Sequence, residues 1–144
     1  MQKREKIADL IQSDQLDREV TVMGWIRSFR NDRFIALNDG STIKTLQVVV
    51  DQENEDPALL KRFTVGAAIK ATGRIIESQG KGQSVELVAE TLVVLGDCDA
   101  DKYPLQPKKH SLEFLRDIAH LRVRTNTFSA VFRIRHAVKF AIHK

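Results

Sequence analysis

Between residues 19 and 95 the sequence contains five short runs rich in β-branched and aromatic residues, and a different kind of segment separates the third run from the fourth. Turn-forming Gly, Asn, Asp and Ser residues bound the runs, which is typical of short strands. The five runs cover residues 20–27, 33–37, 46–50, 68–76 and 85–95. The separating segment, residues 53–63, has Pro57 in its first turn and an apolar stripe, and this pattern predicts a helix. The predicted order is therefore three strands, a helix and two strands.

Five strands in this order fit an all-β core of the OB type, a small and partly open Greek-key barrel with the helix inserted between strands three and four. A five-stranded sandwich stays open as an alternative, because the pattern alone does not fix closure. Asp39-Gly40 favours a hairpin between the second and third strands. Gly24, inside the first strand, predicts a bulge or a sharp bend. Apolar spacing within residues 3–12 predicts a short helix before the barrel.

The character of the sequence changes after the fifth strand. Residues 97–110 are polar and contain two prolines, which predicts a hinge. Ser111 is a predicted cap for one helix, and Thr127 for a second helix with a long apolar stripe. Because an apolar stripe needs something to lie against, the second helix looks truncated. We therefore expect an OB domain at residues 1–96, a hinge at 97–110 and a helical part at 111–144.

Charge is distributed unevenly along the chain. Residues 1–99 hold 13 basic and 16 acidic side chains, whereas residues 100–144 hold 10 and 3. A non-specific nucleic-acid binder should carry an extended positive groove. The predicted barrel offers only a local basic patch, consisting of Arg27, Arg30 and Arg33.

Composition excludes several classes of protein. A hydrophobic content of 42% is enough to build a core, so the chain is not wholly disordered. No run approaches the roughly 18 apolar residues of a membrane helix, and the first residues lack a secretory signal. We therefore expect a soluble, intracellular protein that does not bind membranes. The single cysteine, Cys98, excludes an internal disulfide.

Signals for catalysis and for metal binding are weak. The four histidines form no His-x-x-x-His pair, and no acidic residue lies at ligand spacing from them. Lys81, between two glycines, lacks the spacing of a phosphate-binding loop and reads as a flexible loop tip. We also find no Ser/His/Asp or Cys/His set arranged for nucleophilic catalysis. We assign no catalytic residue and no metal site to this segment.

Strand alternation identifies a candidate binding surface. Phe34 alternates with the aliphatic residues of the second strand, and Gln47 alternates with those of the third, so both are predicted to face outward. An outward ring can stack on a base, an amide can read a base edge, and nearby arginines can contact phosphate. Against this, an exposed Phe is often an ordinary surface residue or a contact with another domain. The same alternation places Arg30 on the core side of the first strand, unless a bulge or the end of the strand shifts the alternation.

Three stretches of the sequence resemble a known family. They are residues 20–27, the hairpin at 34–41 with 46–50, and residues 103–116 with 120–122. The first two are shared by the aspartate, asparagine and lysine subgroup of class II aminoacyl-tRNA synthetases, and the third points to asparagine. Over essentially its whole length, the chain resembles the N-terminal part of asparaginyl-tRNA synthetases.

This resemblance implies an OB-fold that binds the tRNA anticodon. In the subgroup, an aromatic residue of the second strand stacks on the middle anticodon base, a uridine, and a Gln of the third strand hydrogen-bonds that base. Those positions match Phe34 and Gln47. An anticodon-contacting Arg at the end of the first strand matches Arg30, and Arg27 is a weaker match. The implied partner is asparagine tRNA, and no DNA partner is expected.

The resemblance also implies a catalytic domain that this segment lacks. The family activates asparagine with ATP and Mg²⁺ through motifs 2 and 3, which are absent here, so we expect no cofactor in this segment and no aminoacylation by it alone. Residues 128–144 resemble the start of the motif 1 helix, through which the family dimerises in the cytoplasm. Val123 stands where the family usually has proline, which puts the rigidity of that turn in question.

Three alternatives remain open from the sequence. The first is the anticodon domain of the related aspartate or lysine enzyme. The second is a stand-alone binder of single-stranded nucleic acid, against which the net acidic barrel argues. The third is a protein-interaction module in which Phe34 docks on a partner.

Overall fold

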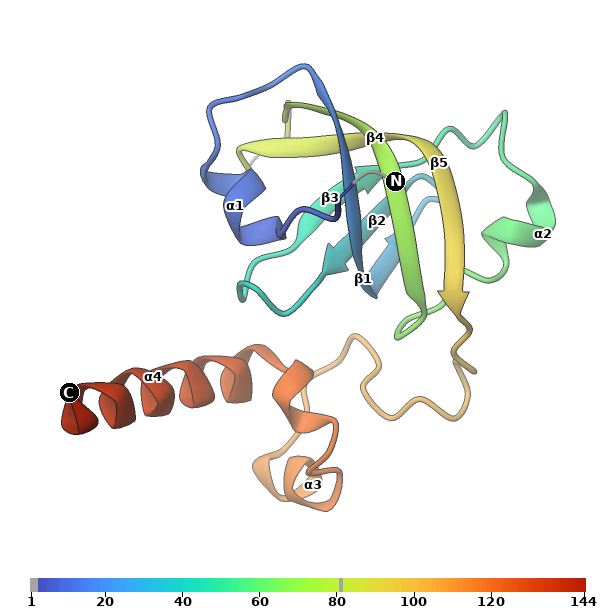
Figure 1. The fold of residues 1–144 in the computed structure, drawn as a ribbon. Helices are drawn as coiled ribbons and strands as arrows, with labels where there is room; N and C mark the ends of the chain where they lie inside the picture. Colours follow the sequence, from blue (N-terminus) through green and yellow to red (C-terminus); the bar gives the residue numbers. More distant parts are fainter. Residues whose placement is uncertain (1–2, 81) are drawn as a thin grey trace. The chain divides into compact units, whose positions relative to one another are not determined.

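The structure is a computed structural model that describes residues 3–80 and 82–144. Lys81, the predicted loop tip, lies outside the described residues. The chain divides into two compact units, Met1–Pro107 and Lys108–Lys144, and each is described by itself (Figure 1).

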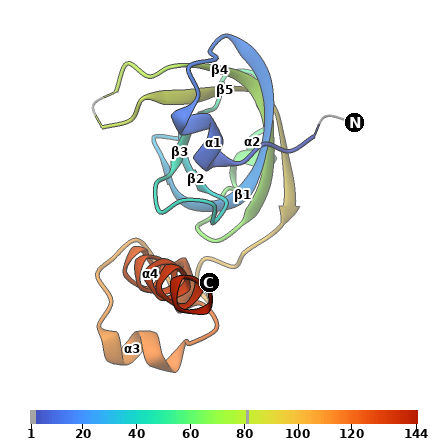
Figure 2. The same cartoon turned by 60° about the vertical axis from the view of Figure 1, so that its left-hand side comes forward.

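The first unit is a closed five-stranded barrel (Figure 2). Its strands are β1 (Arg18–Arg30), β2 (Phe34–Asn38), β3 (Leu46–Val49), β4 (Ala68–Glu77) and β5 (Val85–Gly96). The order around the barrel is β1-β2-β3-β5-β4, and β1 closes the ring by pairing with β4. The β3–β5 pair is parallel and the other pairs are antiparallel. The predicted OB-type barrel is therefore confirmed, and the sandwich alternative is wrong.

The long strand β1 pairs with two neighbouring strands: residues 18–25 pair with β4, and residues 25–30 pair with β2. Gly24 lies where the strand passes from one neighbour to the other. A Cβ at this position would lie 2.6 Å from the carbonyl oxygen of Asn38, so glycine permits the close approach of β2. Gly24 keeps its register with Ile69, so of the two predicted features, a bulge or a sharp bend, the bulge is not at this residue. The register shift of β1 against β2 lies between Ile26 and Ser28.

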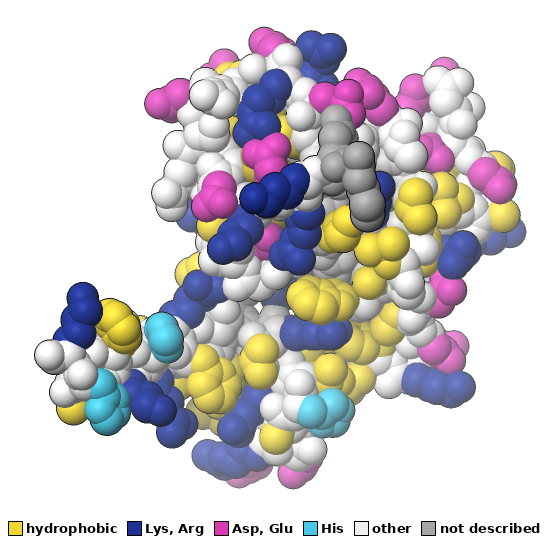
Figure 3. Space-filling model, viewed as in Figure 1, with side chains coloured by type: hydrophobic (Ala, Val, Ile, Leu, Met, Phe, Trp, Pro, Cys, Tyr) yellow, Lys and Arg dark blue, Asp and Glu magenta, His cyan; other side chains and the backbone are white. Residues whose placement is uncertain are grey.

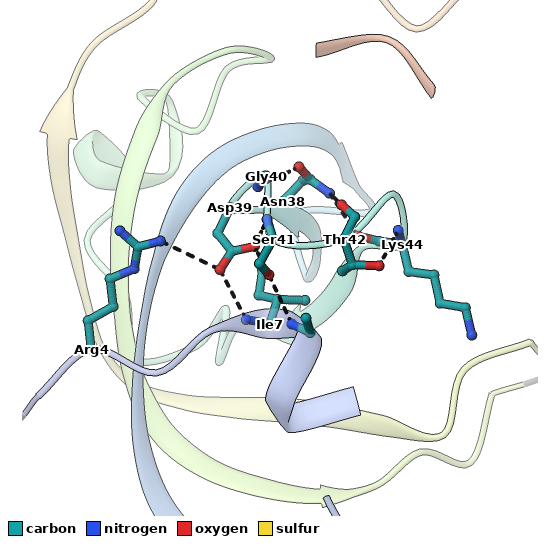
Figure 4. Close-up of polar contacts among 9 residues, drawn as sticks. Arg4, Ile7, Asn38, Asp39, Gly40, Ser41, Thr42 and Lys44 are labelled. Carbon is teal, nitrogen blue, oxygen red and sulfur yellow. Dashed lines mark hydrogen bonds and ion pairs between the residues drawn. The ribbon is translucent and has the colours of Figure 1, made fainter. Parts of the chain in front are cut away.

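Alternate residues of the strands fill the barrel. The side chains with at most 1% exposure include Val20, Val22, Ile26, Ile35, Leu37, Leu46, Val48, Ile69, Ala71, Ile75 and Leu87. The N-terminal helix α1 (Ile7–Gln12) adds Ile7 and Leu10 to this core and is shorter than the predicted helix at residues 3–12. The β2–β3 loop stabilises the first turn of α1, because Asp39 and Ser41 accept hydrogen bonds from the backbone amides of Ile7 and Ala8, each at 3.0 Å (Figure 4).

The helix predicted at residues 53–63 is reduced to one turn, α2 (Pro57–Leu60). Asp56 caps this turn by accepting a hydrogen bond from the amide of Ala58 at 2.8 Å. The preceding residues form turns instead, because the Asp51 carboxylate accepts from the amide of Glu53 and from the Asn54 side chain. Short Asp and Asn side chains compete with a helix in this way.

The first part of the predicted hinge is attached to the barrel. Asp97 pairs with the Arg62 guanidinium at 2.7 Å, and the Thr64 hydroxyl donates to the carbonyl oxygen of Cys98 at 2.5 Å. The ring of Tyr103 packs so closely on Gly66 that an added Cβ there would lie 3.0 Å from it. The boundary between the compact units falls at Pro107, inside the predicted hinge.

The second unit contains α3 (Leu112–Asp117), the 3₁₀ turn η1 (Arg122–Arg124) and α4 (Asn126–His143). Ser111 caps α3 as predicted, by accepting from the amide of Phe114 at 3.2 Å. The cap of α4 is Thr125, which accepts from the amide of Phe128, so the prediction of Thr127 is wrong. Val123 lies in η1 and is half exposed. None of the helices in the described part of the chain combines the length and apolarity that crossing a bilayer requires.

Candidate nucleic-acid interface

Cross-strand pairing places eight residues on one outer face of the barrel. Residues directly opposite each other on neighbouring strands share a face. One row runs across β1, β2, β3 and β5 as Ser28, Ala36, Gln47 and Glu86, and the next row is Arg30, Phe34, Val49 and Val88. We call these eight residues the outer face.

Phe34 lies on the outer face at the start of β2, half-buried, while the next residue, Ile35, is fully buried. Its direct neighbours across the strands are Arg30 and Val49. The guanidinium of Arg33 lies 5.5 Å from the centre of the ring, within cation–π range. The predicted outward direction of Phe34 is therefore what the structure has.

Gln47 lies on the same face, half-buried, between the fully buried Leu46 and Val48. Because Phe34 pairs with Val49 and Gln47 pairs with Ala36, the ring and the amide are diagonal neighbours, a relationship that spans roughly 7–8 Å. The Gln47 amide nitrogen donates to Glu86 Oε2 at 3.1 Å. The amide therefore has a fixed protein partner on β5.

The register shift between Ile26 and Ser28 resolves the position of Arg30. The extra residue in β1 resets the alternation, so Arg30 is exposed and directly opposite Phe34. A tight turn follows, in which Asn31 and Asp32 have φ of 53° and 50° and the Arg33 amide donates to the Arg30 carbonyl at 3.1 Å. Left-handed conformations at both central residues suit a hairpin turn of type I′. This turn places both arginines at the Phe34 end of the outer face.

Arg27 has different surroundings. It is the extra residue of the register shift and is half-buried. Burial lowers the pKa of its guanidinium, and an electrostatic interaction with Tyr103 opposes that shift. The fold therefore brings Arg30, Phe34 and Gln47 together, while Arg27 interacts with the segment that follows the barrel.

Sequence reasoning missed Glu86, the β5 member of the Gln47 row. Its alternation with the buried Val85 and Leu87 gives the same outward signal that identified Gln47. What the sequence did not reveal was the parallel pairing that places Glu86 beside Gln47. The β4–β5 connection supplies a further contact, because the Ser78 hydroxyl donates to Glu86 Oε2 at 3.1 Å.

The outer face is suited to contacts with an unpaired nucleotide. It combines a half-buried ring, an amide of fixed orientation and an exposed arginine, which are the groups that stack on a base, read its edge and meet phosphate. OB barrels bind oligonucleotides on the face of strands two and three and with the β1–β2 and β4–β5 loops. In Figure 3, Lys and Arg side chains are interspersed with Asp and Glu over the visible side of the first unit. Within the described ranges, no three His, Cys, Asp or Glu side chains gather into a metal-binding group.

A family model supports this interpretation. The model of the OB-fold nucleic acid binding domain of the tRNA anticodon type matches residues 20–95. The chain belongs to this family. The matched residues contain β2, β3 and β4, nearly all of β1 and β5, and the whole outer face of the OB-fold domain.

Curated relatives match the OB-fold domain and the residues that follow it. The asparagine–tRNA ligase of Parabacteroides distasonis is 54% identical over 99% of this chain, and that of Cytophaga hutchinsonii is 51% identical over 98%. The matched regions are 31% and 32% of those ligases, so the chain spans about a third of their length. The crystal structure of asparaginyl-tRNA synthetase from Pyrococcus horikoshii, complexed with asparaginyl-adenylate, has a TM-score of 0.80 at 19% identity and covers 98% of this chain and 33% of its own. At that identity the structural match supports the fold alone.

Proposed function

We propose that this chain is the anticodon-binding part of an asparagine–tRNA ligase and recognises asparagine tRNA. The observation that carries the proposal is the diagonal placement of Phe34 and Gln47 on the outer face, with Arg30 opposite the ring. The curated relatives, which match nearly the whole chain at about half identity, support asparagine as the amino acid.

In this proposal, each group of the outer face has one task. The ring of Phe34 stacks on the middle anticodon base, and the Gln47 amide hydrogen-bonds the edge of that base. Arg30, exposed beside Phe34, contacts a phosphate or an adjacent base of the anticodon loop. Arg27 is a weaker candidate for contact, because it is half-buried and interacts with Tyr103.

The chain contributes recognition, and the chemistry belongs to the rest of the ligase. The full-length protein would join asparagine to its tRNA using ATP, as a cytoplasmic homodimer. In this proposal, ATP and Mg²⁺ bind to the part of the ligase outside this segment. We expect the 144-residue segment to be inactive in aminoacylation on its own, with no catalytic residue in it.

A titration tests the proposal. The chain is titrated against an asparagine anticodon stem-loop and against a stem-loop whose middle uridine is replaced by cytidine, with fluorescence anisotropy as the readout. We expect the replacement to weaken binding by roughly 5- to 150-fold, since one wrong base costs about 1–3 kcal/mol. Equal affinities for the two stem-loops would overturn the proposal.

The same assay separates the alternatives. The anticodon domain of an aspartate or lysine enzyme would prefer a stem-loop that carries the anticodon of aspartate tRNA or of lysine tRNA. A non-specific single-strand binder would bind oligouridylate as tightly as the stem-loop, with an affinity that falls steeply with salt. A protein-interaction module would bind neither RNA.

A further inference from the structure

The Gln47 amide is held at one end by a carboxylate. Its nitrogen donates to Glu86 Oε2 at 3.1 Å across the parallel β3–β5 pair. An ionised carboxylate only accepts hydrogen bonds, so the –NH₂ end of the amide, and not the carbonyl end, faces Glu86. The carbonyl oxygen of Gln47 therefore points away from Glu86.

Glu86 is itself fixed by the β4–β5 connection. The Ser78 hydroxyl donates to Glu86 Oε2 at 3.1 Å. Because that hydroxyl gives its proton to Glu86, its oxygen is left to accept, and it does so from Gln83 Nε2 at 3.0 Å and from the Gly80 amide at 3.1 Å. Each hydrogen bond in this network therefore has a defined donor and a defined acceptor, including the bond that the Gln47 nitrogen donates to Glu86.

A Gln without such a partner has no fixed preference between two amide orientations. Turning the amide by 180° exchanges its carbonyl oxygen for its –NH₂ group, and hence an acceptor for a donor. Uridine N3 carries a proton, whereas cytidine N3 is an acceptor. A Gln amide that turns freely can therefore hydrogen-bond N3 of either base about equally well. Selectivity at the middle base therefore needs a residue that fixes the orientation of the amide.

We propose that Glu86 is a positioning residue that selects uridine. By holding the Gln47 nitrogen, Glu86 presents the Gln47 oxygen to the base that stacks on Phe34. The N3–H of uridine donates a hydrogen bond to this oxygen. Cytidine N3 is an acceptor, so with cytidine two acceptors, N3 and the Gln47 oxygen, face each other. This inference rests on the proposed anticodon function, and it assigns the discrimination between the two pyrimidines to a residue that need not touch the RNA.

The test uses the whole chain and three anticodon stem-loops, with uridine, cytidine or 3-methyluridine at the middle position. The variants are Glu86→Gln, Gln47→Ala and the control Glu90→Gln. Glu90 is an exposed residue of the same strand, so the control makes the same change of charge at a position outside the outer face. Circular dichroism checks that each variant is folded.

For the wild type and the control we expect the uridine loop to bind at least roughly tenfold (about 1.4 kcal/mol) tighter than the cytidine and 3-methyluridine loops. In the Glu86→Gln variant the new amide accepts or donates, and the Gln47 amide turns freely. The preference for uridine over cytidine should then fall to about threefold or less. Gln47→Ala should lose the preference as well.

The outcomes distinguish this inference from the proposed function. If the wild type shows no preference at the middle base, the proposed function fails. If the wild type prefers uridine but Glu86→Gln weakens all loops equally, Glu86 is merely structural and the inference fails alone. The inference also fails alone if 3-methyluridine binds as tightly as uridine, because the Gln47 oxygen would then not face N3.

Discussion

Asp39 accepts a hydrogen bond from the backbone amide of Ile7 at 3.0 Å, and in this way the β2–β3 loop caps a helix that lies 32 residues earlier. The second carboxylate oxygen of Asp39 accepts from the amide and the hydroxyl of Ser41. The Arg4 guanidinium lies 3.6 Å from the capping oxygen, and the Asp39 side chain is only 1% exposed. These contacts hold α1, with its buried Ile7 and Leu10, on the barrel (Figure 4).

The first prediction is that Asp39→Asn destabilises the chain in a pH-dependent way. Burial alone would raise the pKa of Asp39, but hydrogen bonds from Ser41 and Ile7, with the charge of Arg4, lower it overall. A lowered pKa in the folded state stabilises the fold above the ordinary pKa of about 3.9, and this contribution disappears as the pH falls through the folded value. At pH 7 we expect Asp39→Asn to lower the free energy of unfolding by about 1–2 kcal/mol.

Urea unfolding between pH 7 and pH 2 measures this effect. The difference in unfolding free energy between the wild type and Asp39→Asn should be constant near neutrality and should become smaller below about pH 4. Asp14→Asn, at an exposed position, makes the same change of charge and should leave the free energy of unfolding within about 0.5 kcal/mol of wild type. A gap that does not depend on pH would show that the charge of Asp39 has no part in the cap.

The second prediction concerns the stacking role of Phe34. Phe34→Leu keeps an apolar side chain but removes the ring, so affinity for the asparagine anticodon stem-loop should fall by about 1–3 kcal/mol. Phe34→Tyr keeps the ring and is the matched control, which should retain most of the affinity. Anisotropy titrations give the affinities, and unfolding curves should be similar for the two variants because the side chain lies on the outer face. Wild-type affinity in Phe34→Leu would refute stacking.

Third, Gly24→Ala should destabilise the barrel. The added methyl group would lie 2.6 Å from the backbone oxygen of Asn38 and 3.2 Å from the Leu37 side chain. Neither the oxygen nor the paired strand around it can move without breaking contacts, so we expect a loss of about 1–3 kcal/mol in unfolding free energy. Gly96→Ala is the control, since its nearest contact is the Ala68 Cβ at an ordinary 3.8 Å. Equal stability of the two variants would contradict the close approach of β1 and β2.

The sequence was sufficient to predict the barrel and the direction of two side chains. Alternation of aliphatic and polar residues depends only on the two-residue period of a strand, and it placed Phe34 and Gln47 outside correctly. The Ser111 cap was equally local, since it needs only a hydroxyl at the start of an apolar run. Features of this kind are encoded within a few neighbouring residues.

The features that sequence analysis missed have two physical origins. The register shift beside Arg27 and the parallel pairing of Glu86 with Gln47 are properties of two strands that lie far apart in the sequence. The first part of the helix predicted at 53–63 is replaced by turns, because the Asp51 carboxylate accepts hydrogen bonds there. In the first two cases a distant strand decided the structure, and single-sequence periodicity does not contain that strand. In the third case a side chain just before the predicted helix decided it, and apolar periodicity does not register such local polar competition.

The fourth prediction is that trypsin cleaves after Lys108 or Lys109 before it cleaves after Lys102. All three lysines lie in the predicted hinge, but the compact units meet at Pro107. Around Lys102 the backbone is hydrogen-bonded, because the amides of Lys102 and Tyr103 both donate to the Asp99 carbonyl. Proteolysis needs a locally opened backbone, so the more firmly bonded site should be cut later.

Gln106 gives this prediction a mutational test. Its side-chain nitrogen donates to the carbonyl oxygens of Ala100 and Tyr103 at 2.7 and 2.8 Å, on either side of Lys102. Gln106→Ala removes both bonds and should speed cleavage after Lys102 by roughly fivefold or more, since one hydrogen bond contributes about 1 kcal/mol. Gln52→Ala, an exposed change in another loop, should not alter the rate. Mass spectrometry of timed digests identifies the cut sites, and cleavage after Lys102 first in the wild type would mean that residues 97–107 are a free hinge after all.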